Sequence, residues 1–418
     1  MRPGAVVAWA FAALLVAMPA AGQDGDLEIH GFVEFGAGAR IQDDALQPDQ
    51  VLLSEARFRM DLLHYGDRAE VSFQGDFTAD GLTDRVDLDI RQALVSVRAS
   101  DWLDVRVGRQ VLTWGTGDLV FLNDLFPKDF VSFFVGREDE FLKAPANALR
   151  LTFYSSAANL DVIATPVFEP DRYITGDRLS YFDRGQGMLV SATSSGAPID
   201  GLRPTRDVRN GELAWRLYRN LAGYELALYG YLGFTKQPLA YDPGAGMARH
   251  SRLGTYGASA RGALAGGIVH LETSYYDQAD DVGDDPLVPN SQWRGLAGFE
   301  HELRANLTGG VQYYLEHLMD HDVLLANSPA PEFEPSRTRH VVTGRLTYRL
   351  LQQTLTASLF GFVSPNDRDA HIRPSLSYAM TDAFTLTGGG NLMLGEDHTF
   401  FGQLADASNV YVRGRYSF

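Results

Sequence analysis

The sequence contains no cysteine, few lysines and no long apolar run beyond its first residues. The absence of cysteine excludes disulfide scaffolds, thiol nucleophiles and cysteine-ligated zinc or iron–sulfur centres. The lysines are Lys128, Lys143 and Lys236, and 36 basic against 53 acidic residues give a net charge of −17. A nucleic-acid-binding protein needs a basic face, so this charge argues against nucleic acid as a partner.

The first 22 residues have the features of a secretory signal peptide. Arg2 provides a positive start, 5–17 is a short apolar run, and 20–22 supply the small residues of a cleavage site near Gln23. This apolar run is shorter than the ~20 residues that a membrane-spanning helix needs, so an N-terminal anchor is the less favoured interpretation. We expect residues 1–22 to be removed on export and residues 23–418 to form the mature chain.

From residue 27 onward, apolar and polar residues alternate with a period of two, which is typical of β-strands with two different faces. Clear examples are 69–77, 224–232, 307–315 and 410–418. Several runs extend to ten or more residues, whereas a strand in a soluble protein usually has about five or six. Strands of roughly 9–11 residues are what a tilted crossing of a lipid bilayer requires.

The spacing of these runs predicts eighteen strands joined alternately by tight turns and mostly long loops. The predicted strands are 27–40, 51–64, 68–80, 85–99, 102–113, 147–157, 159–168, 209–220, 222–234, 252–263, 265–278, 292–303, 305–318, 338–350, 353–364, 369–379, 383–394 and 408–418. The long loops are 114–146, 169–208, 235–251, 279–291, 319–337 and 395–407. Short turns on one side and long loops on the other are typical of a barrel in the bacterial outer membrane.

We therefore predict an all-β fold, a single closed antiparallel transmembrane β-barrel of about 18 strands, with 16 as the alternative. The short turns are expected on the periplasmic side and the long loops outside the cell. A soluble β-sandwich with this many strands would need several domains, yet residues 23–418 contain no linker or low-complexity tract. In lipid, unpaired backbone groups at an open edge cost several kcal/mol each, so the sheet has to close.

Two segments carry a resemblance to known families. The last strand places Val410, Val412, Gly414, Tyr416 and the final Phe418 at alternate positions. This pattern resembles the C-terminal signature by which the barrel assembly machinery recognises bacterial outer-membrane proteins. The segment GRQVLTWG at 108–115 is similar to one in porin-like outer-membrane families, including uncharacterised ones and the alginate-export type. The resemblance implies a channel of eighteen or a similar number of strands, and it implies no particular substrate.

The polar face of each strand is expected to line a water-filled lumen. Arginines predominate on 338–350, 369–379 and 408–418, while acids predominate on the strands from 222 to 318. Such opposed walls would create a transverse field across a pore; alternatively, these residues form ion-pair ladders that only hold the wall. Because arginine binds carboxylates and phosphates bidentately, we expect a weak preference for anionic solutes. The predicted pore-lining residues are Arg57, Arg59, Arg91, Arg106, Arg339, Arg345, Arg349, Arg373, Arg413, Arg415, Glu225, Glu272 and Glu316.

The 114–146 segment is too long and too rich in phenylalanine to be an ordinary solvated loop. Its apolar residues need a wall to pack on, which favours folding of the loop into the barrel. Loops after the fifth strand form the constriction in many porins, so the resemblance implies the same position. The alternative is a rim helix that packs on a neighbouring subunit or on lipopolysaccharide. The residues predicted to narrow the channel are Trp114, Asp118, Asn123, Asp124, Lys128 and Asp129.

Signals for enzymatic chemistry are poor, and neither a catalytic residue, a cofactor nor a metal site is predicted. The pairs 316–317 and 320–321 each join an acid to a histidine, but no third ligand converges on them. The acidic clusters 280–285 and 367–369 are interpreted as solvated loop tips rather than calcium sites. The first strand begins within a few residues of the cleavage site, which leaves no room for a plug domain and argues against energy-coupled transport.

Together these features predict a channel in the cell outer membrane for passive diffusion of small hydrophilic or amphiphilic solutes. One alternative is an export conduit for an anionic polymer or lipid-like molecule, working with a periplasmic partner. Another is a non-conducting structural or surface-binding barrel, with 169–208 as its binding element. The expected partners are outer-membrane lipid, lipopolysaccharide and the assembly machinery through the strand ending at Phe418, and a homo-oligomer is compatible with the sequence.

Overall fold

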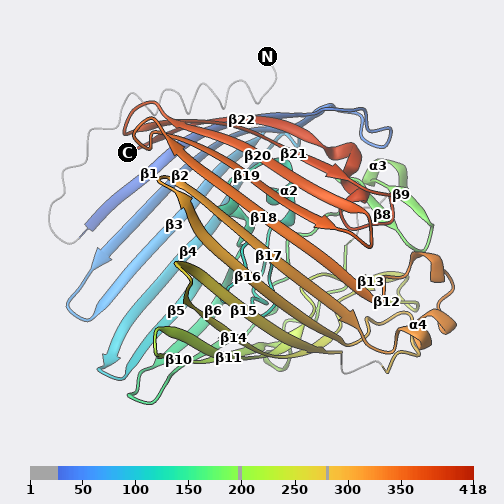
Figure 1. Cartoon of the computed structure of the whole chain (residues 1–418), viewed down its shortest axis with the longest axis horizontal. Coiled ribbons are helices and arrows are strands. Elements are labelled where there is room, and N and C mark those ends of the chain that lie inside the picture. The colour runs from blue at the N-terminus through green and yellow to red at the C-terminus, as the bar shows by residue number, and fades with distance from the viewer. Residues whose placement is uncertain (1–26, 196–199, 279–281) are drawn as a thin grey trace.

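The computed structural model describes residues 27–195, 200–278 and 282–418, so the predicted signal peptide 1–22 lies outside the described residues. Within the described ranges, eighteen antiparallel strands form one sheet that closes on itself, as Figure 1 shows. The predicted fold class is therefore confirmed, with eighteen strands rather than sixteen.

The barrel strands follow one another around the wall in chain order. They are β1 (Leu27–Arg40), β2 (Val51–Tyr65), β3 (Ala69–Asp80), β4 (Arg85–Ser100), β5 (Leu103–Val111), β6 (Pro145–Phe153), β7 (Asn159–Thr165), β10 (Glu212–Leu221), β11 (Tyr224–Phe234), β14 (Arg252–Leu264), β15 (Gly267–Asp277), β16 (Gln292–Arg304), β17 (Leu307–Leu318), β18 (Thr338–Leu350), β19 (Leu355–Ser364), β20 (Asp369–Ala379), β21 (Phe384–Leu394) and β22 (Asn409–Ser417). Closure occurs where β22 pairs with β1, and Phe418 and Gly31 exchange backbone hydrogen bonds of 3.0 Å beyond that ladder.

The observed strands differ from the predicted ones by a few residues at their ends. β7 stops at Thr165 because the following Pro166 has no N–H to donate to a ladder. β19 begins two residues later than predicted, since Leu351, Gln352 and Gln353 form a turn with positive φ angles of 49°, 57° and 72°. Such local turn geometry is not visible in the alternation of apolar and polar residues.

The two faces of the wall have opposite character, as β11 illustrates. Leu226, Leu228 and Leu232 are 41%, 50% and 51% exposed, whereas Ala227 and Tyr229 between them are each 4% exposed and face the interior. Leaving so many large apolar side chains in water would be costly, and lipid removes that cost. The outer surface of the barrel is therefore suited to a bilayer.

Short turns lie at one end of the barrel and most of the long loops at the other. The Ala222–Gly223 turn between β10 and β11 has φ angles of 52° and 85°, the geometry of a two-residue hairpin turn, which glycine adopts without steric cost. The loop end also carries two short connections, 81–84 and 365–368. The chain leaves β5 and β7 through two long connections, 112–144 and 166–211, and residues 196–199 of the second lie outside the described residues.

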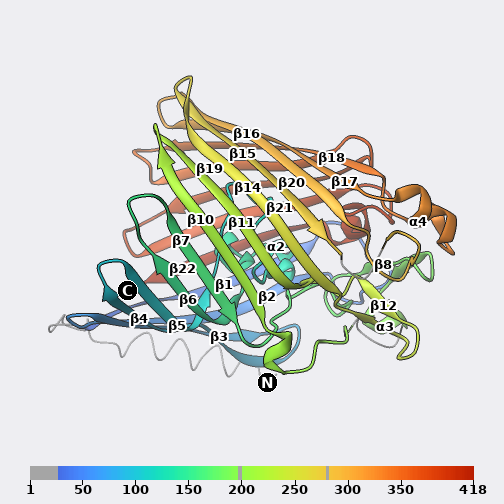
Figure 2. The same cartoon turned by 90° about the horizontal axis from the view of Figure 1, so that it is seen from below.

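Short elements occur within the loops. They are α2 (Phe130–Val135), η1 (Asp139–Leu142), β8 (Tyr181–Asp183), β9 (Met188–Val190), α3 (Ala192–Ser195), η2 (Val208–Asn210), β12 (Ala240–Asp242), β13 (Met247–Arg249), α4 (His321–Asn327), η3 (Pro331–Phe333) and η4 (Gly402–Ala407). Figure 2 shows β8, β12, α3 and α4 together beyond one end of the barrel, with α2 surrounded by strands. None of the described helices is long and apolar enough to cross a membrane.

Candidate constriction site

The β5–β6 loop runs inside the barrel, where both views place α2 (Figures 1 and 2). Phe133, Phe134 and Val135 of α2 are at most 6% exposed and belong to one apolar cluster with residues of the wall. The wall residues of this cluster are Leu52, Leu53, Leu296, Tyr314, Val341, Phe360, Phe362 and Met393. The phenylalanines that distinguish this loop in the sequence are thus buried against the inner face of the strands.

The first half of the loop is held by charged side chains of β15 and β18. Glu272 on β15 accepts hydrogen bonds from the backbone N–H of Thr116 (2.7 Å) and of Asn123 (3.0 Å), and from the Asn123 amide (2.9 Å). On β18, Arg345 donates to both carboxylate oxygens of Asp118 over 2.5 and 2.9 Å. Four residues predicted to line the pore or the constriction therefore meet at this part of the wall, namely Asp118, Asn123, Glu272 and Arg345.

The second half of the loop presents carboxylates to arginines on β2, β20 and β22. These ion pairs are Glu138–Arg415 (2.9 Å), Glu138–Arg413 (3.6 Å), Asp139–Arg373 (2.8 Å) and Glu140–Arg59 (2.7 Å). The acids come from η1 and the residue before it, so one short segment neutralises arginines from three strands. Much of the charge of these arginines is therefore balanced by the loop.

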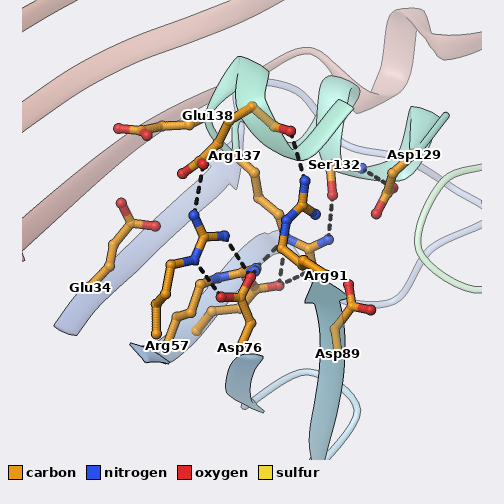
Figure 3. Close-up of polar contacts among 12 residues, drawn as sticks. Glu34, Arg57, Asp76, Asp89, Arg91, Asp129, Ser132, Arg137 and Glu138 are labelled. Atoms are coloured by element: carbon orange, nitrogen blue, oxygen red, sulfur yellow. Dashed lines mark hydrogen bonds and ion pairs between the residues drawn. The ribbon is translucent and has the colours of Figure 1, made fainter. Parts of the chain in front are cut away.

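A buried ion-pair network lies beneath this segment on β2–β4 (Figure 3). Asp76 is 0% exposed and accepts hydrogen bonds from Arg59 (2.6 and 2.8 Å) and Arg57 (3.2 Å). Arg91 donates to the backbone carbonyls of Glu140 (3.0 Å) and Lys143 (2.8 Å). Because breaking a buried pair by removing one partner costs ~3–5 kcal/mol, this network fixes the return path of the loop firmly.

Local capping explains why α2 begins and ends where it does. The Asp129 side chain accepts a hydrogen bond from the Ser132 N–H at 2.8 Å, which caps the first turn. Gly136 ends the helix with φ of 90°, and a Cβ at this position would lie 2.2 Å from the Tyr411 ring on β22. Only glycine allows this close approach of the loop backbone to the wall.

A second charged cluster joins the loop to residues that follow β7. The Lys128 ammonium donates to Asp124 (2.8 Å) and to the carbonyl of Phe126 (2.7 Å), and its backbone N–H donates to Asp171 (2.7 Å). Burial raises the pKa of Asp171 to about 6, although the charge of Lys128 and its N–H lower it in part. Asp124, Lys128 and Asp129 are all buried, so their role is to join segments of the loop rather than to face open water.

The other predicted residues occupy separate parts of the lumen. Trp114 packs edge-on against Phe126 with ring centres 5.0 Å apart. Arg339 pairs with Asp367 (3.1 Å) and Asp369 (3.5 Å), Glu316 with Arg294 (3.2 Å), and Glu225 with Arg216 (2.5 Å). Arg106 and Arg349 are exposed, and neither has an ion-pair partner in the described residues.

No group of three potential metal ligands occurs among the described residues. Glu316 is engaged by Arg294, and His317 contacts the Thr338 hydroxyl at 2.8 Å. Of the acidic clusters named above, Asp280 and Asp281 lie outside the described residues.

Sequence reasoning missed the residues that fasten the loop on β2. Glu55 has a side chain 5% exposed and contacts Arg57, Arg137 and Arg178, two of which come from different loops. Glu55 shares the alternating positions of Arg57 and Arg59, so the period of two could have placed it in the lumen. The arginines that reach it from the loops carry no comparable signal.

Comparisons with known proteins find likeness in structure only. No family model matches the sequence, and no curated protein matches it. The channel OccAB3 of Acinetobacter baumannii superposes with a TM-score of 0.55 at 10% identity, covering 94% of this chain and 99% of the other. OccAB1 of the same organism gives 0.54 at 10% identity, covering 94% and 96%.

The fold therefore defines the class: a porin-like β-barrel of the outer-membrane type, as the sequence predicted. At 10% identity the resemblance to the two Acinetobacter channels is one of fold, and a shared fold does not imply a shared site.

Proposed function

We propose that the protein is a channel of the outer membrane for passive diffusion of small hydrophilic or amphiphilic solutes. The β5–β6 loop, residues 112–144, forms the constriction of this channel, and solutes pass between the loop and the charged wall. The observation that carries the proposal is the path of the loop, which is tethered by charge to both sides of the lumen. A loop held on both sides of the lumen occupies part of its cross-section and so narrows the passage.

Exposed charges at the short-turn end support an aqueous passage. Arg106 on β5, Arg349 on β18 and Glu300 on β16 alternate with lipid-facing residues and are exposed to solvent. Charged side chains inside a barrel need water, because an unpaired charge in a dry interior is strongly unfavourable. Arg106 and Arg349 support a weak preference for anionic solutes, since the other arginines discussed above are paired with acids or, in the case of Arg91, donate to backbone carbonyls.

The arrangement favours diffusion over the export of a charged polymer. A conduit for an anionic polymer needs a continuous basic track, whereas Arg59, Arg373 and Arg415 are each paired with a carboxylate of the loop. A non-conducting barrel is the second candidate, favoured by the dense packing of α2 against the wall. We further propose that the assembly machinery recognises β22 together with the final residue, Phe418.

Deletion of Leu119–Val135 tests the proposal. The strands on either side do not depend on these residues for their ladders, so the barrel should fold and its single-channel conductance should rise severalfold. Folding is checked by heat-modifiable migration on gels, and deletion of 243–246 at the tip of the β12–β13 hairpin is the control. Unchanged conductance in a folded barrel would place the constriction elsewhere, and silence in both proteins would favour the non-conducting barrel.

A further inference from the structure

Two loops from different parts of the chain are fastened to the same buried carboxylate. Glu55 on β2 accepts hydrogen bonds from Arg137 of the β5–β6 loop, among them one of 2.9 Å from Nε. The same carboxylate is 3.4 Å from Arg178 of the β7–β10 connection. Arg178 also pairs with Asp80 on β3 and is 11% exposed at its side chain. Both loops therefore depend on the same carboxylate of β2 for part of their anchoring.

A second joint links the same two loops through their backbones. The Arg172 N–H donates to the Lys128 carbonyl (2.8 Å), and the Phe130 N–H donates to the Arg172 carbonyl (3.0 Å). Between them, Asp129 and Arg172 form a parallel β-bridge and an ion pair of 3.3 Å. The start of α2 is therefore held in part by Arg172, which belongs to residues 166–195 of the β7–β10 connection, called the outer connection below.

The two loops also share apolar packing and leave space where they meet. Leu179 of the outer connection is 1% exposed within the apolar cluster that buries Phe133 and Phe134. Next to it, a cavity of about 270 Å³ is lined by Val131 of α2 together with Ile174 and Leu179. Both loops therefore line one partly open pocket where they meet.

The outer connection reaches the loop end of the barrel. Its β8–β9 hairpin carries Met188 at 54% exposure, and Phe182 packs on Phe333 of η3 with ring centres 5.1 Å apart. Figure 2 shows β8 beyond the ends of the strands, on the side of α4. A segment with one part in solvent and another on the constriction can carry a displacement between the two.

We propose that the two loops form one gate, held at Glu55, so that the constriction widens beyond its docked state only when the outer connection releases Arg178. This inference rests on the proposed function and adds its regulation: the gate is operated from the loop end of the barrel. A displacement of the outer connection at the loop end is passed to the constriction through Arg178. Arg178 is therefore a positioning residue for the constriction loop, although it lies outside that loop.

The absence of native cysteine makes the test direct. Val135→Cys introduces a thiol of similar size at a residue that is 0% exposed in α2, and maleimide labelling of the folded barrel reports release of the loop. In this background, Arg178→Gln should accelerate labelling about tenfold or more. Arg137→Gln should have a similar effect, because each substitution removes one ion-pair partner of Glu55. Relative to Val135→Cys alone, the double variant should accelerate labelling by a factor smaller than the product of the two single-variant factors.

Arg184→Gln is the matched control, because Arg184 belongs to the same connection but has a side chain 55% exposed, 3.7 Å from Glu334. Labelling in this variant should equal that of Val135→Cys alone. The gate is refuted if Arg178→Gln leaves labelling unchanged while Arg137→Gln accelerates it, or if the two effects multiply independently. Because labelling requires no ion flow, a folded barrel that labels as expected but never conducts would refute the proposed function and leave the coupling intact.

Discussion

Phe134→Ala is the substitution that tests most sharply whether α2 is held in the lumen by its own packing. Phe134 is 2% exposed, with its ring 5.1 Å from Phe133 and 5.5 Å from the His371 imidazole. Truncating a buried phenylalanine costs ~3–5 kcal/mol. The barrel ladders do not include this residue, so the loss falls on docking of the loop rather than on unfolding of the barrel.

A loss of ~3 kcal/mol reduces the docked population relative to the undocked one by a factor of ~100. The hydrogen bond from the Asn409 amide to the Phe134 carbonyl (3.0 Å) is kept, because it involves only the backbone of residue 134. We expect more frequent high-conductance states in planar bilayers and faster protease cleavage within the loop.

Phe400→Ala provides the control, because this phenylalanine lies in the β21–β22 loop and is 43% exposed. It should change neither the occupancy of the high-conductance state nor the cleavage rate. If Phe134→Ala folds, as judged by heat-modifiable migration, and matches the wild-type chain in both measurements, the packing argument for the constriction is refuted.

Two further predictions concern charge. The docked arrangement raises the pKa of Asp171 to about 6, whereas an aspartate in water titrates near ~4. Lowering the pH from 7 to 5 should therefore favour the docked loop and reduce conductance, because the docked state binds the proton more tightly. The conductance of Asp171→Asn should stay low at both pH values. If that variant keeps the pH response of the wild-type chain, the response does not come from Asp171. Replacing Arg106 and Arg349 together by glutamine should shift the reversal potential in a salt gradient toward cation preference, whereas Arg85→Gln at the tip of the β3–β4 hairpin should not.

The wall of the barrel could be predicted from the sequence because one physical rule acts on every strand. Lipid outside and water inside impose the alternation seen in Leu226, Ala227 and Leu228, and closure follows from the cost of unpaired backbone in lipid. The turns around Thr165 and Leu351 were placed less accurately, since they depend on a missing N–H and on positive φ angles rather than on alternation.

The contacts of the loop were beyond sequence reasoning for a different reason. The abundance of phenylalanine indicated that the loop needs a wall, but not which strands form it. The pairing of Arg415 with Glu138, or of Arg137 with Glu55, joins residues far apart in the chain and depends on the path that the loop takes. The period of two indicates the face of the strand on which a side chain lies. It does not indicate which loop residue will contact that side chain.

The most direct test of the account is planar-bilayer conductance of the refolded mature chain, with a salt gradient across the bilayer. The account predicts discrete open channels with a reversal potential that indicates a mild anion preference. Persistent silence of a correctly folded barrel, with Leu119–Val135 present and also with that segment deleted, would contradict the central claim that solutes pass through the lumen.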